Sequence, residues 1–195
     1  MSRRGDISIR PAVKSDCRTI AELYRISSDG VAEYIWTKLA EPGEELLDVG
    51  QRRYERESSV FSYRNCRMVE CDAITAGMLI AFPMVIDNEY VESDPVLVPY
   101  SRLEEADSYY ICGMAVFPQF RGRGIGTRLL QLAEQQAREY QLSKLSLIVF
   151  EQNEGALRLY ERSGYREKAH EPVVPHPLIH FEGRALLMVK ELAAG

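Results

Sequence analysis

The stretch Arg121–Leu130 reads RGRGIGTRLL, with glycine at every second position from 122 to 126. It follows the apolar segment YYICGMAV (Tyr109–Val116), which is typical of a buried strand, and it leads into TRLLQLAEQQAREY (Thr127–Tyr140), whose apolar residues recur at helical spacing. A glycine-rich turn between a strand and a helix exposes several backbone N–H groups beside the positive end of the helix dipole. We therefore expect this turn to bind an anion that carries phosphate groups.

The register of the glycines excludes two common nucleotide-binding loops. A dinucleotide-binding fingerprint, G-x-G-x-x-G, lies near the first strand and requires a third glycine where this chain has Thr127. A Walker A loop requires a Gly-Lys pair, which the sequence lacks. The flanking side chains of Arg121 and Arg123 either add positive charge at the phosphates or remain solvated on the surface, and the sequence does not decide between the two.

Length, charge and cysteine content limit the class of protein and the kinds of partner that it can bind. The chain has 195 residues, a natural length for one α/β or α+β domain with a large core. Its 24 basic and 29 acidic residues give a net charge of −5, so we expect no nucleic acid as partner. Four cysteines without a CxxC pair, behind an N-terminal segment without an apolar run, indicate reduced thiols and a cytoplasmic protein. The longest apolar run, Ala76–Ile86, is shorter than the roughly 20 residues that span a membrane, and it predicts a buried strand.

Hydrophobic periodicity predicts alternating helices and strands. The expected strands are Ile7–Ala12, a hairpin from Phe61 to Met84 that turns at Asp72-Ala73, Tyr109–Val116, Leu145–Phe150 and Ala185–Leu192. The expected helices are Ser15–Ser27 with Ser15 or Asp16 as N-cap, Gly30–Ala40, Pro42–Glu57, Thr127–Tyr140 and Glu154–Gly164. Residues 87 to 108 are expected to form a long, mostly irregular insert.

Three segments together resemble the GCN5-related N-acetyltransferase (GNAT) family. RGRGIG, from Arg121 to Gly126, matches the family signature [QR]-x-x-G-x-[GA], and MAVFP (Met114–Pro118) lies upstream where the family strand carries a V-x-P ending. NEGALRLYERSGY (Asn153–Tyr165) is similar to the family's second cofactor segment, and IRPAVKSDCRTIAELY is similar to its opening strand and helix. The matches occur in the family's order across nearly the whole chain, residues 1–195 with a core at about 7–192.

The resemblance implies a mixed sheet, mostly antiparallel, in which the parallel strands Tyr109–Val116 and Leu145–Phe150 separate and admit the pantetheine arm of acetyl-coenzyme A. Met114, Ala115 and Val116 would line that arm, and the amides from Arg121 to Thr127 would hold the pyrophosphate. Asn153 and Tyr160 would face the sulfur end of the cofactor. The implied cofactor-binding residues are therefore Met114, Ala115, Val116, Arg121, Gly122, Arg123, Gly124, Ile125, Gly126, Thr127, Asn153 and Tyr160. No metal is implied.

The implied reaction is direct acetyl transfer to a primary amine of a small molecule or peptide. Tyr160 is the expected acid for the departing thiolate, as the matched tyrosine usually is in the family. A bulge near Gly113 would turn a backbone N–H toward the thioester oxygen, and close packing against another segment is the alternative role for this glycine.

The general base is not evident, because Tyr109–Val116 contains no carboxylate. Four acids flank the two central strands: Glu104, Glu105, Asp107 and Glu151. Any of them could act as the base through a water, but each is expected to be a solvated surface residue instead. Without a base in the strand, a non-catalytic acyl-coenzyme A-binding regulatory module remains an alternative function.

The features that bear on the acceptor are less specific. The insert from 87 to 108 carries seven acids against the single base Arg102, which suggests a cationic acceptor or simply a solvated loop. His170, His176 and His180 lie in a proline-rich segment and favour surface or acceptor-site roles over a metal site. A homodimer is permitted by the sequence but not predicted by it.

Overall fold

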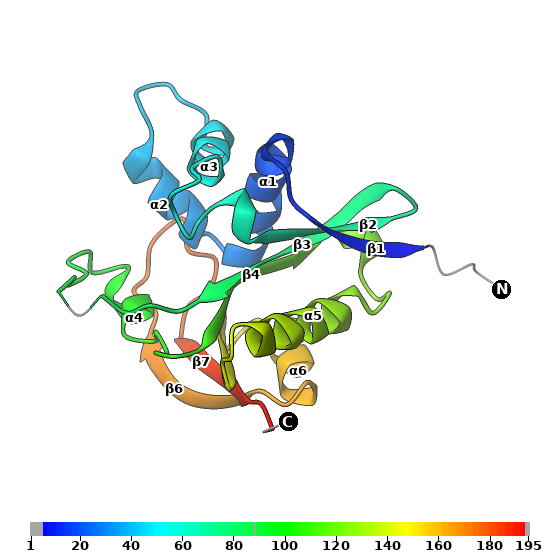
Figure 1. Cartoon of the computed structure of the whole chain (residues 1–195). Coiled ribbons are helices and arrows are strands. Elements are labelled where there is room, and N and C mark those ends of the chain that lie inside the picture. The colour runs from blue at the N-terminus through cyan, green and yellow to red at the C-terminus, as the bar shows by residue number, and fades with distance from the viewer. Residues whose placement is uncertain (1–5, 88, 194–195) are drawn as a thin grey trace. The chain divides into compact units, whose positions relative to one another are not determined.

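The computed structural model describes residues 6–87 and 89–193 (Figure 1). Its strands, within these residues, form one seven-stranded sheet in the order β1-β2-β3-β4-β5-β7-β6, with β4 and β5 as parallel neighbours. The strands are β1 (Ile7–Pro11), β2 (Cys66–Cys71), β3 (Ile74–Pro83), β4 (Tyr109–Val116), β5 (Lys144–Phe150), β6 (Arg166–Pro172) and β7 (Arg184–Glu191). The helices are α1 (Cys17–Ser28), α2 (Val31–Leu39), α3 (Leu46–Tyr54), α4 (Val98–Ser101), α5 (Ile125–Glu139) and α6 (Glu154–Arg162). The expected mixed, mostly antiparallel α/β sheet is confirmed.

The chain forms two compact units. Unit 1 contains residues 6–81 and Gly113–Leu129, and unit 2 contains Phe82–Cys112 and residues 130–193. The division falls within β3, within β4 and within α5, so each of these elements contributes residues to both units.

Unit 1 is built on the antiparallel strands β1, β2 and β3, with α1, α2 and α3 grouped together (Figure 1). The β2–β3 turn is the expected one, because Asp72 and Ala73 both have positive φ, 53° and 64°, as a type I′ two-residue hairpin turn requires. The three helices approach closely at Gly50 of α3, where an added Cβ would lie 2.7 Å from the Trp36 ring and 2.9 Å from Ala21. Glycine at this position therefore lets the helices pack in direct contact.

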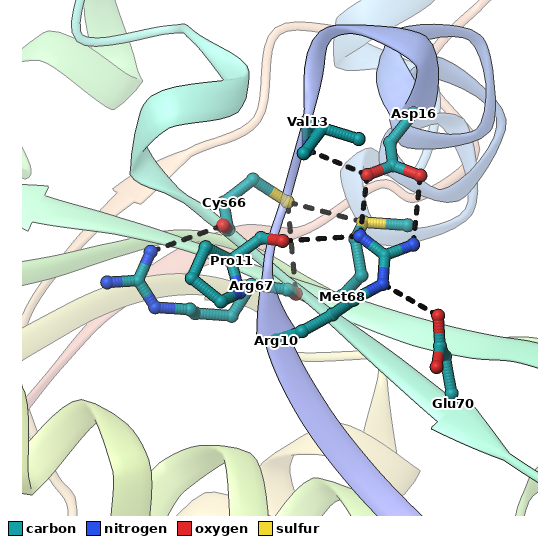
Figure 2. Close-up of polar contacts among 8 residues, drawn as sticks. All are labelled: Arg10, Pro11, Val13, Asp16, Cys66, Arg67, Met68 and Glu70. Carbon is teal, nitrogen blue, oxygen red and sulfur yellow. Dashed lines mark hydrogen bonds and ion pairs between the residues drawn. The ribbon is translucent and has the colours of Figure 1, made fainter. Parts of the chain in front are cut away.

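A part-buried ion cluster joins β1, β2 and the start of α1 in unit 1 (Figure 2). The Arg10 guanidinium donates to both carboxylate oxygens of Asp16, at 2.8 and 3.1 Å, and its Nε donates to Glu70 at 2.6 Å. Asp16 also accepts the Val13 backbone N–H at 2.8 Å. Asp16 occupies the N-cap position of α1, but its side chain makes no capping hydrogen bond. The predicted N-cap position is therefore confirmed, and the Asp16 carboxylate is engaged by Arg10 and Val13 instead of by the helix.

This cluster predicts a specific acid sensitivity of folding. The hydrogen bonds from Arg10 lower the pKa of Asp16 below its ordinary value. A lowered pKa stabilises the folded state fully above the unfolded pKa, about 3.9, and this stabilisation is lost as the pH falls through the folded pKa. We expect Asp16→Asn to flatten the decline in urea midpoint between about pH 5 and pH 2. Asp48→Asn, which breaks an exposed pair with Arg18, is the matched control and should leave that decline unchanged. An equal acid dependence in wild type and Asp16→Asn would contradict the assignment.

Unit 2 contains the parallel pairing of β4 with β5, over Tyr109–Ile111 and Leu145–Leu147, and the antiparallel pairs β5–β7 and β7–β6. Glu105 is buried, with 7% of its surface exposed, and it pairs with Lys144 and, at 2.7 Å, with Lys168. A register shift between Glu167 and Ala169 sets Lys168 apart from the regular pairing of β6. Lys168, which lies outside the regular β6–β7 pairing, thus helps to neutralise the buried carboxylate of Glu105.

Two helix starts differ from the expected ones, and one strand was not predicted. α3 begins at Leu46 and not near Pro42, because Gly43 adopts a left-handed φ of 82° and interrupts the helical pattern. α5 begins at Ile125, two residues before the predicted start, so that Gly126 and Thr127 lie in its first turn. β6 was not predicted, since nearly all of its residues are exposed and no alternation of apolar and polar residues marks it as a strand.

Candidate functional site

The glycine loop connects β4 to α5 within unit 1. A short turn at Pro118–Phe120 ends β4, and the Arg121 N–H donates to the Pro118 carbonyl at 3.2 Å. Gly122 and Gly124 then take positive φ values of 75° and 81°, which side chains rarely adopt. An added Cβ at either glycine would meet no atom within 4 Å, so the loop faces open space on this side.

The loop presents a row of backbone donors. Within the described chain, none of the N–H groups from Gly122 to Thr127 donates a hydrogen bond to another residue. Buried Ile125 anchors the start of α5, and no acidic residue lies in the first turn of this helix. The positive end of the helix dipole and these N–H groups act together on an anion. The loop therefore has the chemistry that the sequence predicted for a phosphate site.

The two arginines of the loop are exposed but held by neighbouring groups. Arg121 donates from Nε to the Val116 carbonyl at 3.2 Å. The Arg123 guanidinium lies 5.4 Å from the Phe120 ring centroid, and its Nη1 lies 3.4 Å from the Cys71 sulfur. Neither arginine is an unrestrained surface side chain, and both are anchored at the base of the loop.

The second half of β4 approaches β3 closely in unit 1. An added Cβ on Gly77 would collide with the Ala115 carbonyl oxygen and would lie 3.2 Å from the Val116 Cα. The Phe117 N–H donates to the Ala76 carbonyl at 2.9 Å. This role of Gly77 was not predicted, although a glycine inside an apolar strand is the signal of a close backbone approach. Met114 and Val116 are half-buried on this strand, whereas Ala115 is buried.

Gly113 packs closely against α1. An added Cβ would lie 2.8 Å from two ring atoms of Tyr24 and 3.2 Å from the Ser27 Oγ. Of the two roles considered for this glycine, the structure shows the close packing, and the bulge that would aim an N–H at the thioester stays a prediction.

Asn153 is the N-cap residue of α6, and Tyr160 lies in the last turn of this helix, both in unit 2. The Asn153 side-chain oxygen accepts the Ala156 N–H at 3.3 Å and so caps the helix, which the sequence did not anticipate. Tyr160 is buried, with 8% of its surface exposed, and its ring lies 5.9 Å from that of Tyr165 at an interplanar angle of 58°.

The four candidate acids have different surroundings. Burial would raise the pKa of Glu105, but hydrogen bonds from Lys144 and Lys168 outweigh it and the pKa is lowered. The expectation of a solvated Glu105 was therefore wrong. Glu151 is held by Arg184 through Nε at 2.7 Å and through the backbone N–H at 2.9 Å, and the pKa of Glu151 is lowered by these hydrogen bonds.

Glu104 differs from these acids because desolvation of its carboxyl raises its pKa, although the residue as a whole is exposed. The charge of Glu104 also contributes to raising the pKa of Tyr110 on β4, an effect dominated by burial of the phenol. Asp107 is exposed with a positive φ of 54°. The surroundings of the Glu104 carboxyl therefore disfavour its charged form.

The remaining candidate features have ordinary partners. His170 contacts Glu167 at 2.8 Å on β6, and the His176 Nδ1 accepts the Leu178 N–H at 3.2 Å. In residues 6–87 and 89–193, no cluster of three or more His, Cys, Asp or Glu side chains is placed to hold a metal ion. No helix in those residues has the length and apolar character needed to cross a membrane.

Comparison with known proteins identifies the family. The model of the Acetyltransferase (GNAT) family matches residues 52–165, more than half of the chain, and the chain therefore belongs to this family. The "Uncharacterized N-acetyltransferase MJ1207" of Methanocaldococcus jannaschii is 38% identical over 68 residues, which cover 35% of this chain and 30% of that protein. The matched segments span between 30% and 37% of the length of the curated relatives.

Solved structures share the fold. YncA of Salmonella typhimurium, solved with its cofactor acetyl-CoA, superposes with a TM-score of 0.62 at 18% identity and covers 97% of this chain and 95% of its own. The PaiA N-acetyltransferase of Thermoplasma acidophilum, solved with coenzyme A, gives a TM-score of 0.58 at 15% identity, with coverage of 95% and 99%. At these identities the likeness is one of fold.

Proposed function

We propose that the protein is an acetyl-CoA-dependent N-acetyltransferase that transfers an acetyl group directly to a primary amine of a small molecule or peptide. The observation that carries this proposal is the loop Gly122–Thr127, whose backbone N–H groups donate to no residue of the described chain. These donors lie at the N-terminus of α5 beside two glycines with positive φ and open space, which suits the pyrophosphate of coenzyme A. Arg121 and Arg123 add positive charge at the loop.

The residues of β4 and α6 are proposed to bind the rest of the cofactor and to assist the transfer reaction. Bound acetyl-CoA supplies an activated thioester, so that the amine nitrogen forms a bond to the acetyl carbon, the C–S bond breaks and one proton passes overall from nitrogen to sulfur. Met114, Ala115 and Val116 contact the pantetheine arm through the β4 backbone. Tyr160 donates a hydrogen bond to the departing thiolate, and Asn153 contacts the same end of the cofactor while fixing the start of α6.

The acceptor is proposed to be cationic. The insert at 87–108 contains seven acids, of which Glu105 is neutralised within the fold by two lysines. Its single base, Arg102, pairs with Glu171 at 3.4 Å. The first part of the insert, from 87 to 94, contains four acids and no basic residue: Asp87, Glu89, Glu92 and Asp94. These acids raise the local concentration of an ammonium group.

The proposal is tested by thiol release from acetyl-CoA in the presence of single amines. The probes are spermidine, free lysine, glucosamine and a short lysine-containing peptide with a free N-terminus, and glutamate is the anionic control amine. Release that depends on at least one cationic probe and exceeds the rate without amine supports the function. Tight binding of coenzyme A without amine-dependent release from any probe would instead support the alternative, a non-catalytic acyl-coenzyme A-binding regulatory module.

We further propose that both units belong to one N-acetyltransferase domain, residues 1–195 with a core at about 7–192. The chain passes between the units three times, and β3, β4 and α5 contribute to both. Cys17, Cys66, Cys71 and Cys112 are free thiols, which fits a reducing cytoplasm. A homodimer stays a hypothesis that sedimentation would test.

A further inference from the structure

Two tyrosines meet at the end of α6 in unit 2. Tyr160 lies in the last turn of the helix and Tyr165 lies just beyond it, with ring centroids 5.9 Å apart. Tyr165 has 0% of its surface exposed and Tyr160 has 8%. The proposed catalytic ring is therefore supported on one side by a fully buried ring.

Main-chain hydrogen bonds at the C-terminus of α6 hold Tyr165 next to Tyr160. α6 ends at Arg162, after which the Gly164 N–H donates to the Glu161 carbonyl at 3.1 Å and the Tyr165 N–H donates to the Tyr160 carbonyl at 3.0 Å. Gly164 has a left-handed φ of 94°. These two hydrogen bonds and the glycine define a Schellman cap, which commonly brings the residue after the glycine against the side chain at the position of Tyr160. The cap thus fixes Tyr165 to Tyr160 through the main chain and through the rings.

The surroundings of Tyr165 indicate a packing role and not proton transfer. Its hydroxyl is buried and makes no hydrogen bond within the described residues. Burial raises the pKa of Tyr165, with a smaller contribution from the charge of Glu134, so this phenol stays neutral and is a poor proton donor. Glu134 is paired with Lys190 at 2.5 Å, and the Lys190 side chain lies 3.4 Å from the Cβ position of Gly164. Tyr165 thus contacts Tyr160 ring to ring, while its own hydroxyl makes no hydrogen bond within the described residues.

We propose that Tyr165 is a positioning residue, which holds the Tyr160 ring through the C-cap of α6 in the orientation that its acid role requires. The inference rests on the proposed function of Tyr160. When the Tyr160 ring is held in one orientation, no rotamer entropy has to be lost in each turnover to place its hydroxyl. Misplacement of a catalytic group lowers the rate more than it changes cofactor affinity.

The test compares Tyr165→Leu with Tyr165→Phe in thiol release, with acetyl-CoA and the best probe amine varied in turn. Tyr165→Leu removes the ring and is expected to lower kcat about tenfold while the KM for acetyl-CoA stays within about twofold. Tyr165→Phe keeps the ring and is expected to retain the wild-type kcat. Tyr54→Leu removes another fully buried ring, in unit 1, and serves as the control for general destabilisation.

The outcomes separate the two proposals. If the wild type turns over and folded Tyr165→Leu has the same kcat, the positioning role alone is overturned. The same holds if kcat falls as far in Tyr54→Leu as in Tyr165→Leu. Loss of kcat in Tyr165→Phe would overturn it in favour of a role for the hydroxyl. Absence of wild-type turnover with every probe would remove both proposals.

A second variant decides the question if Tyr165→Leu does not fold. Gly164→Ala strains the cap at a φ of 94° while its methyl group meets only the flexible Lys190 side chain. It should lower kcat with little change in the KM for acetyl-CoA. Gly43→Ala, at a φ of 82° with no atom within 4 Å, carries similar strain elsewhere and should leave kcat unchanged. Equal kcat values in the two alanine variants would contradict the inference.

Discussion

Tyr160→Phe is expected to lower kcat for acetyl transfer about a hundredfold, within the range for loss of a positioned acid–base group. The substitution keeps the buried ring and its contact with Tyr165, so the fold should be retained. A phenol with a pKa near 10 protonates a thiolate near 8.5 uphill by roughly 2 kcal/mol, so a hydrogen bond to the thiolate is expected to supply much of the effect.

The measurement is steady-state thiol release with the best probe amine, together with the dissociation constant of coenzyme A. Because the hydroxyl acts on the departing sulfur, kcat and kcat/KM should fall together while the affinity for coenzyme A changes little. Tyr140→Phe removes a hydroxyl from an exposed ring and is the matched control. A Tyr160→Phe variant with wild-type kcat would show that Tyr160 is a packing residue.

Gly124→Ala is expected to weaken binding of coenzyme A about tenfold or more, because the left-handed conformation costs an alanine about 1–2 kcal/mol. The φ of Gly124 is 81°, and its new methyl group would lie in open space beside the loop. The free loop of the variant relaxes from this conformation, so binding either has to restore the strain or uses N–H groups that point elsewhere, and both weaken an anion site.

Gly43→Ala is a close control for this effect. Gly43 also has a left-handed φ, 82°, and open space around its Cβ position, but it lies in the turn before α3. Both variants should lose similar stability in urea, whereas only Gly124→Ala should lose affinity in a calorimetric titration with coenzyme A. Equal affinities in the two variants would argue against the loop as the pyrophosphate site.

The sequence predicted the local features of the site better than its packing. The glycine register of Arg121–Gly126 and the helix after it follow from backbone chemistry, so they were visible without a structure. The end of α6 was likewise marked by Gly164. Such features depend on a few neighbouring residues, and the structure confirms the loop conformation and both helices.

Features that depend on distant residues were not predicted. Glu105 was expected at the surface because a lone carboxylate is costly to bury, and only the fold brings Lys144 and Lys168 to it. The contact of Gly77 with Ala115 depends on strand pairing, which the sequence does not specify. β6 lacks a buried face, so the periodicity that reveals the other strands is absent from it.

The central claim, that the loop Gly122–Thr127 binds the pyrophosphate of coenzyme A, is tested most directly by comparing coenzyme A with pantetheine in calorimetric titrations. Pantetheine keeps the thiol arm but lacks the pyrophosphate and nucleotide, and 4′-phosphopantetheine provides an intermediate. Two hydrogen bonds to a charged group contribute about 3 kcal/mol or more, so coenzyme A should bind about a hundredfold more tightly than pantetheine. Most of this difference should disappear in Gly124→Ala. Equal affinities of the wild-type protein for coenzyme A and pantetheine would contradict the claim.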